Sequence, residues 1–332
     1  MNLNEQNTLA IFWNVFVKKL CSGFKYYVIV LFFALIACSE KQTNTPLSIG
    51  SFGWIGYEPF YVARDLGLYQ NTAIKLVELN NSTDIMYALR AGQLDGAILT
   101  LDEVITLLHD GMEFSVVFII DISNGADAVL TKPGISSMQE LAGKQVAVEY
   151  TAMGAMLLEN ALSHHAMSNR DIQIVPCASD RHLDCFANSE AIVTFEPYKT
   201  KLINQGANIV FDSSQIKGQI IDVLAIRNEV LKEKQFVIKK LISGFDKALE
   251  YMQKEPDKTN QIIHQRIKLS PVEINAIFAD IEFPGVSGNH ELFSNGSLQK
   301  NALGLIEMMH KNNMINEPVS IDKLFTSNYL PD

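Results

Sequence analysis

Short apolar runs and longer amphipathic stretches alternate along the chain from residue 47 onward. The apolar runs have the length of strands. Each amphipathic stretch carries apolar residues at helical spacing and ends at or near a glycine, which favours a helix end. Such alternation is typical of parallel sheets connected by helices. In this first series we expect strands at residues 47–52, 74–79, 96–99 and 114–120, and helices at 57–67, 83–92 and 100–111.

A second alternating series follows the first. It predicts strands at residues 128–131, 145–149, 172–175 and 191–195, with helices that start near Ser137, Thr151 and Asp180. Residues 216–227 form another extended stretch, and the chain is almost entirely helical from Lys232 onward. Two series of this kind predict an α/β fold of two lobes, each a mostly parallel sheet flanked by helices.

The polar stretches 121–127 and 212–222 stand where one series gives way to the other. We expect the chain to cross between the lobes at these two places, which would form a hinge. The first lobe then comprises residues 47–122 and 223–332, and the second comprises residues 123–222.

Local signals fix several helix starts and one buried face. Thr100 with Glu103, and Ser270 with Glu273, have the spacing of capping boxes, in which a hydroxyl and a carboxylate satisfy the free N–H groups of a first turn. Pro271 suits the first position of the second of these helices. A stripe at spacings of three and four predicts one buried face on a long helix: Val237, Leu241, Phe245, Leu249 and Met252.

The first 38 residues differ from the remainder. Lys18, Lys19 and Lys25 precede an unbroken apolar run at residues 26–37, which is shorter than the roughly 20 residues of a membrane span and suits a secretion signal. The run ends in Leu-Ile-Ala-Cys, which resembles a bacterial lipobox with Cys38 as the lipidated residue. We expect a signal peptide at residues 1–37 and a tether at 38–46. The alternative is an uncleaved anchor helix, and either places the later residues outside the cytoplasm at a membrane.

The composition limits the classes of function that the chain can have. The chain has 332 residues, of which 48% are hydrophobic and 19% charged, so it can bury a large core. Its net charge of -10 excludes proteins that track along nucleic acid, since these need an excess of Lys and Arg. Apart from Cys21 in the expected signal peptide and Cys38 in the lipobox, the cysteines are Cys177 and Cys185. An oxidising compartment would permit them to pair, the alternative being two separate thiols, and no metal site is expected.

Four segments resemble one protein family in consistent order. They are WIGYEPFYVARDLG at residues 54–67, STD at 82–84 followed by ALRAGQLDGA at 88–97, LAGKQVAV at 141–148 and VTFEPY at 193–198. Together they resemble the nitrate, sulfonate and taurine class of periplasmic binding proteins, whose members include thiamine-precursor binders. The resemblance covers roughly residues 47–325.

This resemblance implies a periplasmic-binding-protein-like fold of type II whose cleft closes over a small molecule by hinge bending. It further implies delivery to an ABC permease and ATPase, no cofactor and no catalysis. We expect a monomer on the periplasmic side of the cell envelope, anchored to the membrane by its lipid.

Candidate ligand-binding residues follow from the strand order. Ligands of open α/β sheets settle beyond the carboxyl ends of the strands, where loops lead into helix starts. Serine and threonine hydroxyls there act first as helix caps and can also hold an anionic group. In chain order, the residues that this rule selects are Trp54, Tyr57, Glu58, Ser82, Thr83, Thr100, Asp121, Asn124, Tyr150, Thr151 and Glu196.

Acidic residues dominate these positions and the crossings. Arg64 and Arg90 lie within helices, where they are less suited to line a cleft. A cleft of this charge would repel a dianion, which favours a ligand with amine, amide-like or aromatic-nitrogen donors, stacked on Trp54, over a simple oxyanion such as nitrate or sulfate. The alternative is that several of these acids face solvent or cap helices. The acids in question are Glu58, Asp121, Asp127, Glu149, Glu196 and Asp222.

Two other functions are compatible with parts of this pattern. A lipoprotein that senses its ligand for a membrane receptor would carry the same features. An enzyme similar to the fungal pyrimidine-precursor synthases, which share this fold, would carry a cysteine cluster that this sequence lacks. His164 and His165 are adjacent and therefore face different sides of a helix. No phosphate-binding loop, dinucleotide fingerprint or nucleophile elbow occurs.

Lipidation at Cys38 is directly testable. We expect the protein to incorporate a radiolabelled or clickable palmitate in its native host, and the Cys38→Ala variant to lose the label, because only the cysteine thiol accepts the diacylglycerol. Cys21→Ala is the matched control and should keep the label. Label retained in Cys38→Ala, measured by gel fluorography of membrane fractions, would contradict the assignment.

Overall fold

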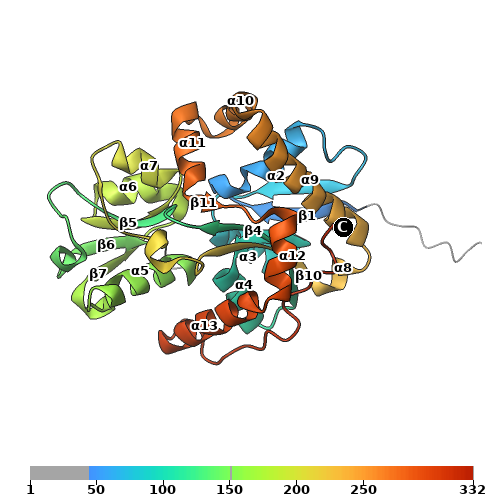
Figure 1. Ribbon diagram of the computed structural model, residues 1–332. Coiled ribbons are helices and arrows are strands. Elements are labelled where there is room, and N and C mark those ends of the chain that lie inside the picture. The colour runs from blue at the N-terminus through green and yellow to red at the C-terminus, as the bar shows by residue number, and fades with distance from the viewer. Residues whose placement is uncertain (1–44, 150–151, 332) are drawn as a thin grey trace, which may run out of the picture. The chain divides into compact units, whose positions relative to one another are not determined.

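Two β-sheets organise the chain in the computed structural model, which describes residues 45–149 and 152–331 (Figure 1). The larger sheet has six strands in the order β11-β4-β10-β3-β1-β2. β1 pairs in parallel with β2 and β3, whereas β10 is antiparallel to β3 and β4, and β11 is antiparallel to β4. Its strands are β1 (Leu47–Ser51), β2 (Ile74–Glu78), β3 (Gly96–Thr100), β4 (Phe114–Ser123), β10 (Ile221–Arg227) and β11 (Ile281–Glu282).

The smaller sheet has five strands in the order β7-β6-β8-β5-β9. β6 is parallel to β7 and β8, and β5 is antiparallel to β8 and β9. All five strands come from the middle of the chain: β5 (Asp127–Thr131), β6 (Gln145–Val148), β7 (Gln173–Pro176), β8 (Ala191–Phe195) and β9 (Asn208–Asp212).

Helices flank both sheets, and the C-terminal helices cover the larger one (Figure 1). The α-helices associated with the larger sheet are α2 (Glu58–Asp65), α3 (Ser82–Arg90), α4 (Leu101–His109), α8 (Asn228–Leu231), α9 (Gln235–Lys254), α10 (Pro256–Ile267), α11 (Pro271–Ala279), α12 (Gly285–Ser294) and α13 (Ser297–Lys311). Those of the smaller sheet are α5 (Ala152–His164), α6 (His182–Ala187) and α7 (Tyr198–Ile203). Short 3₁₀ helices are η1 (Ile55–Tyr57), η2 (Met138–Leu141), η3 (Asn169–Asp171), η4 (Ser179–Arg181) and η5 (Ser213–Ile216).

The α/β fold class is confirmed, with one difference in the sheets. Both sheets are mixed, whereas the sequence pattern predicted mostly parallel strands. β5 and β10 each begin at a crossing and run away from the place where the sheets meet. The strands that they pair with run towards that place, so these pairs are antiparallel, and β11 adds a further antiparallel edge strand.

The chain crosses between the sheets twice within the described residues, after β4 and after β9, as predicted. The two crossings are bonded to each other. The Ser213 hydroxyl lies 2.7 Å from the Ser123 hydroxyl and accepts a hydrogen bond of 2.7 Å from the Gly125 N–H. Ser213 is fully buried, so these bonds are shielded from water.

The outer edge of β4 is covered by three C-terminal pieces. Val116 exchanges backbone hydrogen bonds with Leu324 and Thr326, and β11 pairs with the end of the strand. Between them, the buried side chain of Asn289 in α12 serves Ile119: its Oδ1 accepts from the N–H at 2.6 Å, and its Nδ2 donates to the carbonyl at 2.8 Å. An amide side chain thus replaces a strand neighbour and keeps this edge from exposing unpaired backbone groups.

Most local signals from the sequence correspond to structure, with some differences. The Ser270 and Glu273 capping box is confirmed, and the Glu103 carboxylate accepts from the Thr100 N–H. Leu241 and Phe245 of the predicted stripe are buried in α9. The segment near Ser137 is a 3₁₀ helix only, and β9 was not predicted.

Cys177 and Cys185 form a disulfide, which decides between the two alternatives left open by the sequence. None of the described helices has the length and apolar character that a membrane span requires. The expected signal peptide, most of the tether and Cys38 lie outside the described residues.

Asn289 gives a stability prediction. Asn289→Ala leaves the Ile119 N–H and carbonyl buried without partners, so we expect the free energy of unfolding to fall by about 2–5 kcal/mol. Glu291→Ala, an exposed change on the same helix, should alter it by less than about 0.5 kcal/mol. Urea denaturation followed by circular dichroism measures both. Equal effects of the two variants would mean that the edge of β4 does not depend on Asn289.

Candidate ligand-binding site

The candidate site lies where the two sheets meet. The ends of β1, β3 and β4 and the start of β10 face the start of β5 and the ends of β6 and β8. Aromatic rings join the two sides: the Phe195 ring centroid at the end of β8 lies 5.8 Å from those of both Phe52 and Trp54. The Thr83 hydroxyl at the start of α3 donates to Glu149 after β6 at 3.4 Å.

Two aromatic side chains bind a pair of buried aspartates. Trp54 Nε1 donates to Asp121 Oδ2 at 3.2 Å, and the Tyr57 hydroxyl donates to Asp222 Oδ1 at 2.5 Å. Asp121 and Asp222 are directly opposite each other on β4 and β10, and each is no more than 3% exposed. The turn between the two aromatics must therefore approach the carboxylates closely.

Gly56 permits that approach. A Cβ at this position would lie 2.3 Å from both Asp121 Oδ2 and Trp54 Nε1, so any other residue would force the carboxylate or the indole ring to move. The glycine between Trp54 and Tyr57 is thus required by contact with the aspartates, and its role could not be read from the turn alone.

Two more buried aspartates adjoin this pair. Asp102 at the start of α4 is 1% exposed and Asp127 at the start of β5 is 3% exposed. Burial raises the pKa of Asp102 to about 7, assisted by the charge of Glu103 and more weakly by that of Asp127. Burial likewise raises the pKa of Asp127 and of Asp121 to about 7. The pKa of Asp222 lies well above its ordinary value, because of burial and then the charge of Asp121.

Several buried polar atoms in this region have no hydrogen-bond partner. They are Asp102 Oδ2, Asp121 Oδ1, Asp127 Oδ2 and His182 Nε2. Nearly all buried polar groups in folded proteins are hydrogen-bonded, so these unpartnered atoms make this region the candidate site.

His182 supplies the wall on the smaller sheet. It is fully buried in α6, with Nδ1 2.9 Å from the Thr194 hydroxyl and its ring packed edge-on against Phe195 and Tyr198. Burial lowers its pKa to about 4, so the imidazole is neutral at physiological pH. His182 is the first residue of α6, and its ring turns into the interior.

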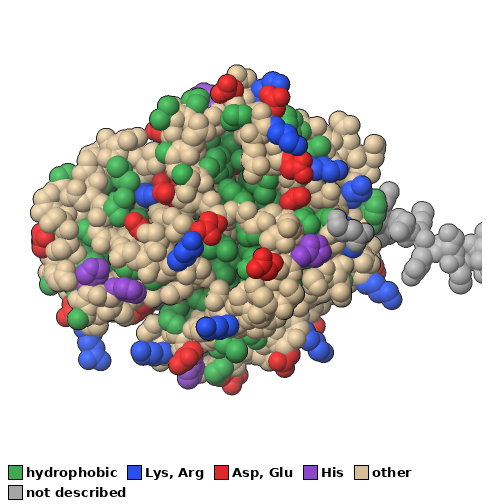
Figure 2. Space-filling model, viewed as in Figure 1, with side chains coloured by type: hydrophobic (Ala, Val, Ile, Leu, Met, Phe, Trp, Pro, Cys, Tyr) green, Lys and Arg blue, Asp and Glu red, His purple; other side chains and the backbone are tan. Residues whose placement is uncertain are grey.

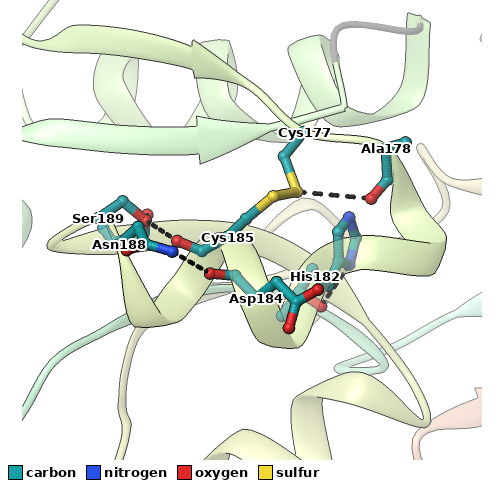
Figure 3. The surroundings of a disulfide bond; sticks show 9 residues. Cys177, Ala178, His182, Asp184, Cys185, Asn188 and Ser189 are labelled. Carbon is teal, nitrogen blue, oxygen red and sulfur yellow. Dashed lines mark hydrogen bonds between the residues drawn. A yellow bond between two sulfur atoms is a disulfide. The ribbon is translucent and has the colours of Figure 1, made fainter.

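The disulfide braces this wall. It joins Cys177, just after β7, to Cys185 in α6, and His182 at the start of α6 lies between the two cysteines in the sequence (Figure 3). Closing so short a loop limits the positions that the loop can adopt. A cavity of about 280 Å³ opens beside it, lined by Asn81, Thr83 and Asp84 on one side and by Glu149, Pro176, Cys177 and Ala178 on the other.

Lys199 is the buried cation of the region, and sequence reasoning did not select it. Its ammonium lies 2.7 Å from Asp280 and 3.6 Å from Glu196, and it donates to the Gly125 carbonyl at 2.8 Å. Its charge also lowers the pKa of Asp127 against the larger effect of burial. Because its donors are engaged, Lys199 is not available for an anionic ligand.

The structure brings together four of the residues predicted from strand ends: Trp54, Tyr57, Thr100 and Asp121. Ser82 and Thr83 lie at the start of α3, but Asn81 is the N-cap, since its Oδ1 accepts from the Asp84 N–H at 2.9 Å. Thr83 instead donates a hydrogen bond to Glu149. Burial, together with the charge of Glu103, raises the pKa of Glu149 to about 7.

Three predicted residues are engaged elsewhere. Glu58 accepts from Arg266 Nε at 3.1 Å, Asn124 donates to Glu282 at 3.1 Å, and Glu196 accepts from the Thr200 N–H and hydroxyl at 3.0 and 2.9 Å. Glu196 thus caps α7, which is the alternative that the sequence left open for acids of this kind. Tyr150 and Thr151 lie outside the described residues. Within the described ranges, no group of three His, Cys, Asp or Glu could hold a metal ion.

The chain is similar in sequence to known proteins. A model of the NMT1-like family matches residues 40–267. Curated proteins of Brucella abortus and Brucella suis, each named as a binding protein, are 22% identical over 158 residues, which are 45% of this chain and 49% of theirs. The chain therefore spans about half the length of the curated relatives it matches.

Solved structures share the fold. The ligand-binding component of an ABC-type import system from Staphylococcus aureus, solved with zinc bound, is 15% identical with a TM-score of 0.71 over 86% of this chain and 98% of that chain. The alkanesulfonate-binding protein SsuA from Xanthomonas axonopodis, bound to MOPS, is 14% identical with a TM-score of 0.72 over 85% and 98%. The aliphatic sulphonate-binding protein SsuA from Escherichia coli is 18% identical with a TM-score of 0.67 over 85% and 92%. The predicted periplasmic-binding-protein-like fold is confirmed.

The buried carboxyl groups give a prediction for the ligand-free protein. Their pKa values near 7 exceed those of the unfolded chain, so the folded protein holds extra protons below pH 7 and its free energy of unfolding falls as pH rises through 7. We expect the melting temperature to drop by about 4 °C or more between pH 6.5 and 8.5. His182, with its lowered pKa, opposes this trend only below that window.

Differential scanning calorimetry of ligand-stripped protein measures this dependence. Asp127→Asn should reduce the slope, because it removes one raised pKa, whereas the exposed Asp257→Asn should leave it unchanged. A melting temperature that rises over the same range would contradict the protonated state of these acids.

Proposed function

The chain belongs to the NMT1-like family, and from that premise we propose that it is the extracytoplasmic solute-binding component of an ABC importer. It captures a small polar organic cation, an amine or a protonated nitrogen heterocycle, between the two sheets. The observation that supports this ligand class is the group of four buried aspartates, three of which have an oxygen without a partner.

Charge is the step that favours a cation. Carboxyl groups that are desolvated together resist ionisation, and a bound cation would supply the opposite charge that lets them ionise. An oxyanion would instead add a like charge to Asp102, Asp121, Asp127 and Asp222. Among the described residues that face this region, Lys199 is already paired and His182 is neutral. Sulfonate binding, which the names of two similar structures state for those proteins, therefore does not suit this chain.

Aromatic groups suit the same ligand. Trp54 and Tyr57 hold the aspartates through their polar atoms, and Phe195 and Tyr198 approach from the other sheet. Rings of this kind attract cations through their faces and shield them from water. The carboxylates would form directional hydrogen bonds with the ligand's N–H groups, and the rings would contact its apolar part. Together they would recognise an organic ammonium ion.

The two sheets would act as lobes. We assign residues 47–122 and 223–332 to one lobe and 123–222 to the other, with the paired crossings near Ser123 and Ser213 as the hinge. Closing brings Phe195 against Trp54 and encloses the acids. The closed form would be the one that a permease and its ATPase recognise, and a lipid at Cys38 would hold a monomeric protein on the periplasmic side of the membrane.

Isothermal titration calorimetry against matched ligands tests the proposal. We expect micromolar or tighter binding of at least one member of a panel of primary amines, amidines and aminopyrimidines, and no binding of nitrate, sulfate or alkanesulfonates. If binding ionises one carboxyl group of pKa near 7, affinity should rise roughly tenfold from pH 6 to pH 8. Mass spectrometry of small molecules that co-purify with the protein shows which compounds to include in the panel.

Two variants distinguish the effect of a charge in the site on ligand binding from the effect of the protein's net charge. Asp127→Asn should weaken binding of the amine by about tenfold or more and flatten the pH dependence, because it removes one counter-charge. Asp257→Asn changes net charge equally at an exposed position and should have no effect. Selective binding of oxyanions, or affinity for amines that falls as pH rises, would refute the proposed ligand class.

A further inference from the structure

A second cavity, of about 250 Å³, lies among the C-terminal helices and is lined by none of the residues of the candidate site. Leu249 and Met252 of α9, Phe278 of α11 and Phe283 after β11 form its apolar part. Figure 2 shows hydrophobic side chains gathered in a hollow between α9 and α11. A volume of this size suits a small organic molecule with one ring.

The polar part of the cavity comes mainly from α10 and its neighbours. Thr259 is 3% exposed, and its hydroxyl is buried without a hydrogen-bond partner. Asn260 is 4% exposed and donates through Nδ2 to Oδ1 of Asn275 on α11 at 3.1 Å. An unsatisfied buried hydroxyl beside an amide pair is costly in an apolar setting unless a further polar group joins it.

The amide pair defines the chemistry that fits. The bond between the two asparagines uses one donor and one acceptor, which leaves the acceptor of Asn260 and a donor of Asn275. Exchanging the oxygen and nitrogen of both side chains leaves the same complement, so the inference does not depend on how the amides are oriented. A ligand group with an adjacent donor and acceptor, such as an amide or lactam edge, matches it.

The absence of charged side chains from the cavity lining argues against a charged ligand. The side chains that line the cavity are all uncharged: Leu249, Met252, Gln253, Pro256, Thr259, Asn260, Asn275, Phe278 and Phe283. An ion buried here would lose its hydration without gaining a counter-charge. We propose that this cavity is a second ligand site, which takes a small neutral molecule carrying an amide or lactam edge on an apolar ring. This inference rests on the cavity alone and is independent of the function proposed for the region between the sheets.

Three probes of one shape and different charge test it: benzamide, benzoate and benzylamine. Protein-observed NMR follows the Met252 methyl group in this cavity and the Trp54 indole N–H in the other site. We expect benzamide to shift the Met252 methyl resonance in a saturable manner, and benzoate and benzylamine to bind there at least tenfold more weakly.

A variant and its control sharpen the test. Asn275 is exposed, so Asn275→Ala should fold normally, and it should weaken benzamide binding about three- to tenfold through the loss of one hydrogen bond. Val272→Ala, on the same helix and outside the cavity, should leave affinity unchanged. The inference is overturned if no probe shifts Met252 at millimolar concentration, if only Trp54 responds, if the three probes bind equally, or if Asn275→Ala binds as tightly as the unaltered protein.

Discussion

Four aspartates buried side by side constrain everything around them. Desolvation is the largest cause of their raised pKa values. Neighbouring charges add to it at Asp102 and Asp222, whereas hydrogen bonds with Asp222 and Trp54 lower the pKa of Asp121 against the effect of burial. Trp54 and Tyr57 donate to two of them, and Gly56 exists to let that contact form. On the proposed function, the acids are kept where the sheets meet to bind the ligand, although apolar residues of similar size would stabilise the fold better.

The same contacts that close the two sheets also remove water from the acids. Phe195 covers Trp54 and Phe52, and His182 turns a neutral ring into the same region. On the proposed function, closure and the ionisation of these groups are linked: excluding water disfavours the charged carboxylates, and a cation between the sheets would offset that effect. On the proposed function, this link is the physical reason that a ligand of the correct charge would favour the closed form over the open one.

The sequence predicted the strand ends better than it predicted the side-chain partners. Trp54 and Tyr57 follow β1, Thr100 is the last residue of β3, and Asp121 lies near the end of β4. The prediction that ligands bind at strand ends was enough to place these residues together. Glu58 has the same kind of position, yet its carboxylate is held by Arg266, a partner 208 residues later in the chain. Asn124 is likewise bound by Glu282, 158 residues away. Periodicity carries no information about such distant pairs, which is also why Lys199 and the inward turn of His182 were missed, and why the strands that return at the crossings were expected to be parallel.

The segment at residues 280–282 shows why the C-terminal helices are more than a cover. Asp280 accepts the Asn124 N–H with its carbonyl oxygen and binds Lys199 of α7 with its carboxylate, while Glu282 binds Asn124 and Lys217. One short piece of chain therefore contacts both crossings and a helix of the smaller sheet. If the sheets move apart at the crossings, the bond between Asp280 and Lys199 must stretch or break, and Lys199 would then lose a counter-charge beside Asp127. The balance of charge among the buried acids is thus tied to the position of this segment, and through it to the packing of α11 and α9.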